Sequence, residues 1–359
     1  MANPTTRIAY LTQVPGPYRE QMHEILAKQD EIEYSVIYCA LLEPNRSWKL
    51  ELGKYNRYFL SEKAKSFRHN NINVWKLLNK LKPQVLIITA FKPTMLYGYL
   101  WCILRGAKLV VYNDGTLESE RGYSKIQKII RKIVFRKAEA FLAPGQGTVD
   151  LYNSYQIPDK TIFKSCLCVD NSRFSATKME SRKYHLMFSG QIIERKMPLF
   201  FVEVAAKLKK TIPNLKVLVI GDGNMRAAMI NALDAQNIDY DFKGFLDQAS
   251  LPMQYATAKL FLFPTLNDPW GIVVNEACAS GTPVLTCPAA GAAHDLVLDH
   301  QNGFVLPLDA DAWANHALLL LQNEVLWEAF SEKAISTVKD FNHQQSADGI
   351  IDSIIYALV

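Results

Sequence analysis

The sequence predicts an α/β protein built from two successive doubly wound domains of similar size. The chain has 359 residues, more than one hydrophobic core usually serves. Short β-rich apolar runs alternate with longer helical patterns, which is typical of parallel sheets covered by helices. The alternation stops at a polar stretch, residues 175–183 (SATKMESRK), and then begins again. This stretch has no apolar periodicity, so we predict a linker there.

The first predicted domain covers residues 1–174. Apolar runs predict strands at 7–12, 34–40, 84–90, 108–113, 140–143 and 162–168. Helical periodicity between them predicts helices at 18–28, 74–81, 93–104 and 123–137.

The second predicted domain covers residues 184–340. Strands are predicted at 185–189, 216–220, 239–242, 260–263 and 283–286, followed by apolar segments at 294–298 and 303–306. Helices fit 198–210, 225–236, 272–280, 309–323 and 324–340, and Pro198 suits the first turn of its helix. We predict a last helix within residues 341–359, and this helix can pack back on the N-terminal domain. Doubly wound domains bind ligands at the carboxyl ends of their strands, so we expect the active site in a cleft between the two domains.

The composition excludes several classes of protein. With 49% hydrophobic and 21% charged residues, the chain is unlike disordered, collagen-like or coiled-coil sequences. The net charge of +5 suits an anionic ligand or membrane surface and does not argue for nucleic acid. No apolar run reaches the roughly 18–20 residues that cross a bilayer, and no signal peptide is visible. We therefore expect a cytoplasmic protein, either free or peripheral at the inner face of a membrane.

Cysteine and acidic residues show no metal-binding pattern. The six cysteines are scattered, and only Cys166 and Cys168 lie close together. No second pair completes a zinc site, so we expect free thiols, with this pair on one strand face. We predict no metal and no cofactor.

Glycine-containing loops follow several predicted strands of the second domain. They are SGQIIERK at 189–196, IGDGNM at 220–225, KGF at 243–245, DPWGIV at 268–273 and PAAGAAHD at 288–295. Glycines let backbone amides approach a ligand, and helix N-termini favour anions. The dinucleotide fingerprint GxGxxG is absent. Arg195 and Lys196 follow the first of these strands, where they either neutralise a phosphate or are two solvated loop charges.

Two carboxylates stand out around the fourth of these loops. Asp268 precedes Pro269, so it is either a helix cap or a ligand-binding acid. Glu276 lies in a helix that is otherwise small and apolar, as in a buried segment. A carboxylate buried there needs hydrogen-bonding partners, which a ribose could supply. The alternative is a surface charge.

These residues resemble a known family. Asp268, seven residues and Glu276, followed by Gly281–Thr282–Pro283–Val284, are similar to the motif of the GT4-like retaining glycosyltransferases. The segment from Ser189 to Lys196 resembles their diphosphate loop, and VIGDGNM and FKGF match in order and spacing. The resemblance is strong over residues 183–306. In the first half, YLTQVPGPYREQMHEIL and the segment from FLAPGQG to VDNSRF resemble acceptor-domain landmarks. The resemblance as a whole implies a GT-B fold, in which two Rossmann-like domains face each other across a cleft.

The resemblance also implies roles for individual residues. Glu276 would bind the ribose, Asp268 the donor sugar, and Lys196 with Arg195 the departing diphosphate. Donor-binding residues would further include Gly16, Gly190, Gln191, Gly221, Phe245, Gly271, Ile272 and Val273. Two positions depart from the family, because many relatives have Arg at position 191 and Glu at position 268. No histidine matches the one that touches the donor sugar in some relatives. That stretch holds Asn113, Asp114 and Glu118, which either contact the acceptor or donor or cap a loop.

The implied function is transfer of a sugar from a nucleotide-diphosphate sugar, with retention, to a hydroxyl of a saccharide or lipid-linked saccharide. Family frequency favours a UDP-sugar, and the setting would be polysaccharide or glycoconjugate assembly. A nucleotide-sugar epimerase, a sugar phosphorylase, or a catalytically silent subunit that binds a nucleotide sugar or scaffolds a partner would fit the same fold.

One helix suggests a membrane contact. Residues 123–137 (YSKIQKIIRKIVFRK) put Ile126, Ile129, Ile130 and Ile133 on one face and basic residues elsewhere. Such a helix can lie on an anionic membrane, which suits a lipid-linked acceptor. The alternative is an outer helix whose apolar stripe packs into the core.

Overall fold

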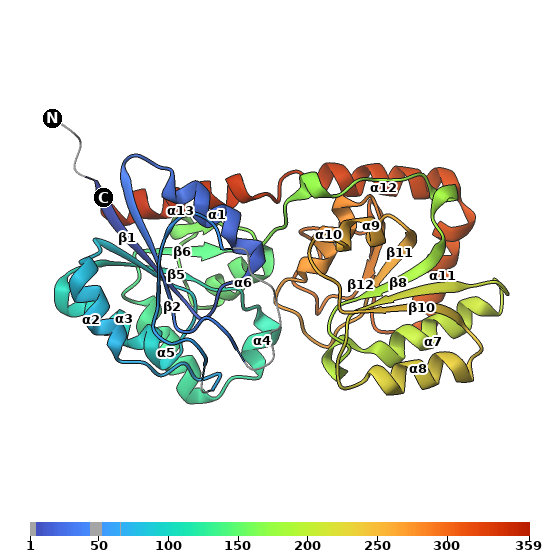
Figure 1. Cartoon of the computed structure of the whole chain (residues 1–359), viewed down its shortest axis with the longest axis horizontal. Helices are drawn as coiled ribbons and strands as arrows, with labels where there is room; N and C mark the ends of the chain where they lie inside the picture. Colours follow the sequence, from blue (N-terminus) through green and yellow to red (C-terminus); the bar gives the residue numbers. More distant parts are fainter. Residues whose placement is uncertain (1–4, 44–51, 65) are drawn as a thin grey trace. The chain divides into compact units, whose positions relative to one another are not determined.

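A computed structural model describes residues 5–43, 52–64 and 66–359. These residues form two compact units, one of residues 1–167 and 343–359 and the other of residues 168–342. Each unit contains a parallel sheet with helices on both faces (Figure 1). The predicted α/β class with two Rossmann-like domains is therefore confirmed.

The sheet of the first unit has the strand order β3-β2-β1-β4-β5-β6-β7. Its strands are β1 (Thr6–Thr12), β2 (Ile32–Tyr38), β3 (Asn56–Phe59), β4 (Val85–Ile88), β5 (Lys108–Tyr112), β6 (Ala140–Ala143) and β7 (Ile162–Lys164). Its helices are α1 (Pro17–Ala27), α2 (Asn73–Leu81), α3 (Pro93–Arg105), α4 (Leu117–Arg121), α5 (Lys125–Phe135), α6 (Gln146–Ser154) and α13 (His343–Leu358). The edge strand β3 and the short helices α4 and α6 were not predicted.

The sheet of the second unit has the order β10-β9-β8-β11-β12-β13. Its strands are β8 (Tyr184–Ser189), β9 (Lys216–Ile220), β10 (Asp239–Gly244), β11 (Ala258–Phe263), β12 (Val284–Thr286) and β13 (Gly303–Val305). Its helices are α7 (Pro198–Lys209), α8 (Arg226–Ala235), α9 (Leu251–Tyr255), α10 (Ile272–Ala279), α11 (Ala310–Gln322) and α12 (Glu324–Val338). The strand order reverses at β8, the switch point beside which such sheets bind ligands.

The C-terminal helix α13 belongs to the first unit, where it lies beside α1 (red beside blue in Figure 1). A Cβ on Gly349 would lie 1.8 Å from the carbonyl oxygen of Lys164, so glycine lets the helix approach the chain after β7. The hydroxyls of Ser165 and Ser346 are 3.0 Å apart in the same contact. Helix α13, which is sixteen residues long, is thus part of the layer that packs on the sheet of the first unit.

The predicted linker at 175–183 is wrong, because this segment packs in the second unit. Met179 and Arg182 are buried, and Thr177 donates a hydrogen bond to the carbonyl of Ala256. The boundary between the units lies at residues 167 and 168 instead. The sequence is polar there because seven of the nine residues are exposed, and only Met179 and Arg182 anchor the segment in the unit.

Arg182 holds several main-chain carbonyls of the second unit. Its guanidinium donates to Ala258 O at 2.8 Å, Ser280 O at 2.8 Å and the Thr282 hydroxyl at 2.7 Å. The Trp327 ring lies 4.8 Å from its centre. Burial lowers the pKa of Arg182 to about 10, still high enough to keep it charged at neutral pH. One cation therefore closes the end of α10 and the start of β11.

The cysteines are free and buried, as expected. Cys166 and Cys168 follow β7 and do not lie on one strand face, because that strand ends at Lys164. The predicted strand 162–168 is therefore too long.

We predict that Arg182→Met strongly destabilises the second unit. It leaves buried carbonyls without donors, each costing about 1–3 kcal/mol, so a loss of about 3 kcal/mol or more is expected. The measurement is the midpoint of urea unfolding. Lys207→Met is the matched control, because it removes a cation from an exposed pair with Asp311. Equal losses in the two variants would contradict this role for Arg182.

Candidate active site

Three glycines lie side by side at the carboxyl ends of β8, β9 and β10. Gly190 has a φ of 139° and Gly221 a φ of 123°, both in the region that favours glycine. The Gly190 amide donates to Ile220 O at 3.0 Å, and the Gly221 amide to Gly244 O at 2.8 Å. A Cβ on Gly221 would lie 1.8 Å from Gly190 O. The loops thus pack backbone against backbone, and they place Gly190 and Gly221 at this edge.

Glu276 lies inside the second unit, on α10, with only 4% of its surface exposed. The hydroxyl of Tyr255 donates to its Oε2 at 2.7 Å and lies 2.9 Å from the Ser189 hydroxyl. Burial raises the pKa of Glu276 to about 7, although the Tyr255 bond and the charge of Arg173 lower it. The surface-charge alternative is wrong. This carboxylate at the sheet edge has one hydroxyl partner among the described side chains.

Lys196 and Arg195 do not lie free in solvent. They end the 3-10 turn Glu194–Lys196, and both hold Asp268. Arg195 Nη1 is 3.1 Å from Asp268 Oδ2, and Lys196 Nζ bonds the same oxygen. The Lys196 ammonium also lies 4.4 Å from the centre of the Phe263 ring. The structure therefore joins four predicted site features of the second unit: the cation pair, Asp268, the turn into α10 and the glycine loops.

The charges of this cluster compensate one another. Burial alone would raise the pKa of Asp268, but the charge and hydrogen bond of Lys196 and the charge of Arg195 hold it below its usual value. Burial lowers the pKa of Lys196, partly offset by Asp268. We therefore assign Asp268 as a carboxylate and Lys196 as an ammonium at neutral pH.

The helix-cap interpretation of Asp268 is also wrong. The N-cap of α10 is Gly271, with a φ of 89°, and no side chain caps it. Asp268 Oδ1 instead accepts from the Trp270 amide at 3.1 Å, two residues on, as in an Asx turn. A Cβ on Gly271 would lie 2.8 Å from the Phe263 ring. The first amides of α10, including those of Ile272 and Val273, are the ones a helix leaves without internal acceptors.

The remaining donor-side predictions in this unit lie at its surface. Gln191 is exposed beside Gly190, and Phe245 is 56% exposed after β10. Neither has a described side-chain hydrogen bond or ion pair. Both lie in the loops at the carboxyl edge, and their predicted roles stay predictions.

The predicted residues of the first unit separate into buried and exposed ones. Gly16 is the buried N-cap of α1. Asn113 is buried, its Oδ1 accepts from the Gly115 amide at 3.2 Å, and its Nδ2 has no hydrogen-bond partner among the described residues. Asp114 follows it. Burial lowers the pKa of the Arg19 guanidinium, but Tyr10, Tyr112 and, to a smaller extent, Asp114 raise it above its ordinary value.

Glu118 is exposed and pairs with Arg121 at 2.5 Å, three residues on. It therefore has an ordinary surface partner. Its neighbour Glu120, which was not predicted, is buried and bonds Arg131 and Tyr155.

The basic helix α5 does not bury the predicted apolar stripe. Ile126 is 70% exposed and Ile129 57%, and Ile133 is exposed as well. The helix buries Arg131, Val134 and Phe135 instead. The alternative in which the stripe packs into the core is wrong for these three isoleucines, whereas Ile130 is half-buried.

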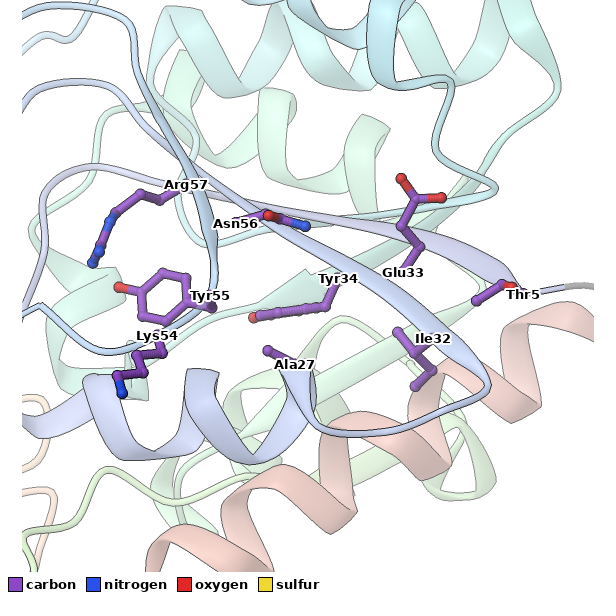
Figure 2. Close-up of a pocket in the computed structure, with 9 residues that line it drawn as sticks. All are labelled: Thr5, Ala27, Ile32, Glu33, Tyr34, Lys54, Tyr55, Asn56 and Arg57. Atoms are coloured by element: carbon purple, nitrogen blue, oxygen red, sulfur yellow. The ribbon is translucent and has the colours of Figure 1, made fainter.

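A cavity of about 660 Å³ lies in the first unit, where β2 and the start of β3 meet the end of α1 (Figure 2). Its lining includes Tyr34, Lys54, Tyr55 and Arg57. None of the predicted site residues lines it.

Neither a metal-binding cluster nor a membrane-spanning helix is found among the described residues. No group of three or more His, Cys, Asp or Glu side chains there is arranged to hold a metal ion. Within residues 5–43, 52–64 and 66–359, no helix has the length and apolar character needed to cross a bilayer.

Sequence reasoning missed Tyr255, whose hydroxyl contacts both Glu276 and Ser189. Ser189 belongs to the predicted diphosphate segment, but its type alone gave no signal. Tyr255 ends a five-residue helix that has no recognisable pattern. Only the fold shows that it reaches across 21 residues of sequence to Glu276.

The second unit is similar in sequence to a known protein family. A model of the family described as glycosyl transferases group 1 matches residues 170–337. The 2-deoxystreptamine N-acetyl-D-glucosaminyltransferase of Niallia circulans is 30% identical over 151 residues, 41% of this chain and 38% of that protein. An uncharacterized glycosyltransferase of Methanocaldococcus jannaschii is 20% identical over 336 residues, 84% of this chain and 81% of that protein. The chain thus spans well under half of the first relative.

The fold has a close structural counterpart. The crystal structure of Anabaena HepE in complex with UDP matches with a TM-score of 0.79, covering 98% of this chain and 100% of that chain. The sequence identity is 14%, so this likeness concerns the fold alone. It is the GT-B architecture of two Rossmann-like domains. The family model covers most of the second unit, which is therefore similar to the glycosyl transferases of group 1.

Proposed function

We propose that this chain transfers a sugar from a nucleotide-diphosphate sugar, with UDP as the favoured nucleotide, to a hydroxyl of a saccharide or lipid-linked saccharide. The observation that carries the proposal is the buried Glu276 at the carboxyl edge of the second sheet. A buried carboxylate with one hydroxyl partner has acceptor capacity left for the paired hydroxyls of a ribose. The crystal structure of HepE, which shares the fold, contains UDP, and this supports the choice of nucleotide.

The donor's leaving group sets the chemical task. Breaking the bond to a nucleoside diphosphate develops negative charge on the diphosphate, and preorganised cations and amides stabilise such charge best in a water-poor site. We assign this task to Lys196, Arg195 and the amides at the start of α10. The open amides of a helix start also favour an anion.

We propose retention of anomeric configuration, with the leaving phosphate accepting the proton of the acceptor hydroxyl on the same face. No carboxylate nucleophile is assigned, because Asp268 is engaged by two cations. Asn113 and Asp114 remain candidates for acceptor contacts in the first unit. Nuclear magnetic resonance of the product would report its anomeric configuration.

The first test of the proposal is release of nucleoside diphosphate from a panel of UDP-, GDP- and TDP-sugars, with and without saccharide acceptors. Lys196→Ala and Glu276→Ala should each lower the rate of transfer by about 100-fold or more, since each removes a group that touches the donor. Lys207→Ala, an exposed cation on α7, is the control and should keep full activity. A folded Glu276→Ala variant with normal transfer would remove the central claim.

The raised pKa of Glu276 gives a separate prediction about stability. The folded protein keeps this proton up to about pH 7, whereas the unfolded chain loses it near the ordinary value of 4.5. The wild type therefore loses stability as pH rises through this window, by about 3 kcal/mol. Glu276→Gln cannot ionise, so it should match the wild type at pH 5 and be more stable at pH 8.

Urea unfolding at the two pH values measures this difference. Glu118→Gln, which changes an exposed acid, should show no such pH-dependent gain. A Glu276→Gln variant whose stability relative to the wild type is the same at pH 5 and pH 8 would show that Glu276 is not a buried acid with a raised pKa.

We further propose that the first unit contacts an anionic membrane through α5. Its exposed Ile126, Ile129 and Ile133 recur at helical spacing, and a lysine directly precedes each of them, at Lys125, Lys128 and Lys132. Helix α3, which packs on the same hydrophobic core as α5, exposes Leu100, Ile103 and Leu104. Apolar side chains flanked by cations suit the boundary of an anionic bilayer, where each cation contributes about 1 kcal/mol. Such a contact would bring the chain to a lipid-linked acceptor.

The triple substitution of Ile126, Ile129 and Ile133 by Ser tests this surface. The wild type should sediment with phosphatidylglycerol vesicles and less with phosphatidylcholine vesicles, and the triple variant should stay in the supernatant. Val325→Ser, at an 80% exposed apolar residue of the second unit, should behave like the wild type. Wild-type protein that does not sediment with anionic vesicles would contradict the membrane proposal.

A further inference from the structure

The carboxylate of Asp268 accepts three hydrogen bonds from groups of its own protein. Its Oδ2 accepts from Lys196 Nζ and from Arg195 Nη1, and its Oδ1 accepts from the Trp270 amide. Only 8% of its surface is exposed. A carboxylate has about four lone-pair directions, so three are used before any donor binds. This is a poor arrangement for a residue that recognises sugar hydroxyls.

The backbone of Asp268 is fixed as firmly as its side chain. Its amide donates to Ala289 O at 3.1 Å, and its carbonyl accepts from the Gly291 amide at 2.8 Å. A Cβ on Gly291 would lie 1.9 Å from Pro269 O, so the two loops need glycine there to touch. Asp268 is therefore held in place by the loop after β12.

Asp268 joins two groups that would face a donor diphosphate. On one side is the turn that carries Arg195 and Lys196. On the other side is the turn through Trp270 into α10, whose first amides are open. Main-chain bonds support the same connection, since the Leu266 amide donates to Arg195 O at 2.9 Å and the Thr265 hydroxyl donates to it at 3.0 Å. The carboxylate thus sets the spacing between the cations and the helix start.

The charge of Asp268 also maintains the charge of its partner. Lys196 is buried against the Phe263 ring, and burial disfavours its ammonium form. The charged and titratable groups that act on it are Asp268, Arg195 and Cys287, and of these Arg195 opposes its charge. A buried cation that loses its counter-ion is strongly destabilised.

We infer that Asp268 is a positioning residue, which acts on the donor diphosphate by holding Lys196 and the start of α10, and that it does not recognise the donor sugar. This inference rests on the proposed function. It differs from the role implied by the family resemblance, in which this acid contacts sugar hydroxyls. It implies that removing the negative charge of Asp268, which lies beside the anion site, weakens the binding of the anion.

The experiment compares binding of UDP, which has no sugar, with binding of UDP-sugars by isothermal titration calorimetry. GDP and TDP are titrated in parallel to cover the other nucleotides. Asp268→Asn should lower the affinity for the bare nucleoside diphosphate by about 10- to 100-fold, the range typical of residues that orient a binding group. Affinity for the nucleotide sugar should fall by a similar factor. Asp268→Glu keeps the counter-ion and should recover part of the loss.

Two results would overturn the inference. If Asp268→Asn leaves the affinity for the nucleoside diphosphate unchanged and weakens only nucleotide-sugar binding, Asp268 recognises the sugar. If the affinity for the nucleoside diphosphate rises, Asp268 merely competes with it for Lys196. A wild type that binds none of the three nucleoside diphosphates would instead contradict the proposed function, and this inference with it.

Two controls separate positioning from general damage to the fold. Asp311→Asn makes the same change in an exposed acid on α11 and should leave binding unchanged. Circular dichroism and unfolding midpoints establish that each variant is folded. A destabilised but folded Asp268→Asn variant with wild-type affinity for the nucleoside diphosphate would also refute the positioning role, because a purely structural residue affects stability and not this affinity.

Discussion

The site in the second unit depends on a buried cation that has no carboxylate partner among the residues the structure describes. Arg182 neutralises carbonyl dipoles at the end of α10 and the start of β11. Helix C-termini favour positive charge, and this one is buried where water cannot satisfy its carbonyls. Because Arg182 closes this end, α10 can be a short interior helix of small residues. That burial is what gives Glu276 its unusual environment.

The two acids of the site are buried to a similar degree but are in opposite electrostatic states. Asp268 has two cations and an amide, so its pKa lies below the usual value despite burial. Burial raises the pKa of Glu276 to about 7, because its neutral hydroxyl partner and the charge of Arg173 offset only part of the effect of burial. The first acid is satisfied by the protein, and the second is left with hydrogen-bonding capacity for a ligand. This difference separates a group that organises the site from one that binds.

The first unit reverses the usual arrangement of an amphipathic helix. The inner face of α5 carries Arg131, whose charge is met by buried Glu120 and whose guanidinium lies 4.9 Å from the Phe91 ring. The outer face carries isoleucines next to lysines. An arginine satisfied inside and apolar side chains outside distinguish α5 from a solvated outer helix, which would show the opposite pattern.

The sequence by itself determined the alternation of strands and helices, the glycine turns at the strand ends and the burial of Glu276 among small apolar neighbours, because these properties repeat locally. Tertiary structure alone decided that 175–183 packs inside a unit, that Asp268 holds two cations, that Tyr255 meets Glu276 and that α5 turns its isoleucines outward. Each of these depends on which distant segments the sheet order brings together. Local periodicity shows that a helix has an apolar face, but only the segments that pack against the helix determine which of its faces is buried.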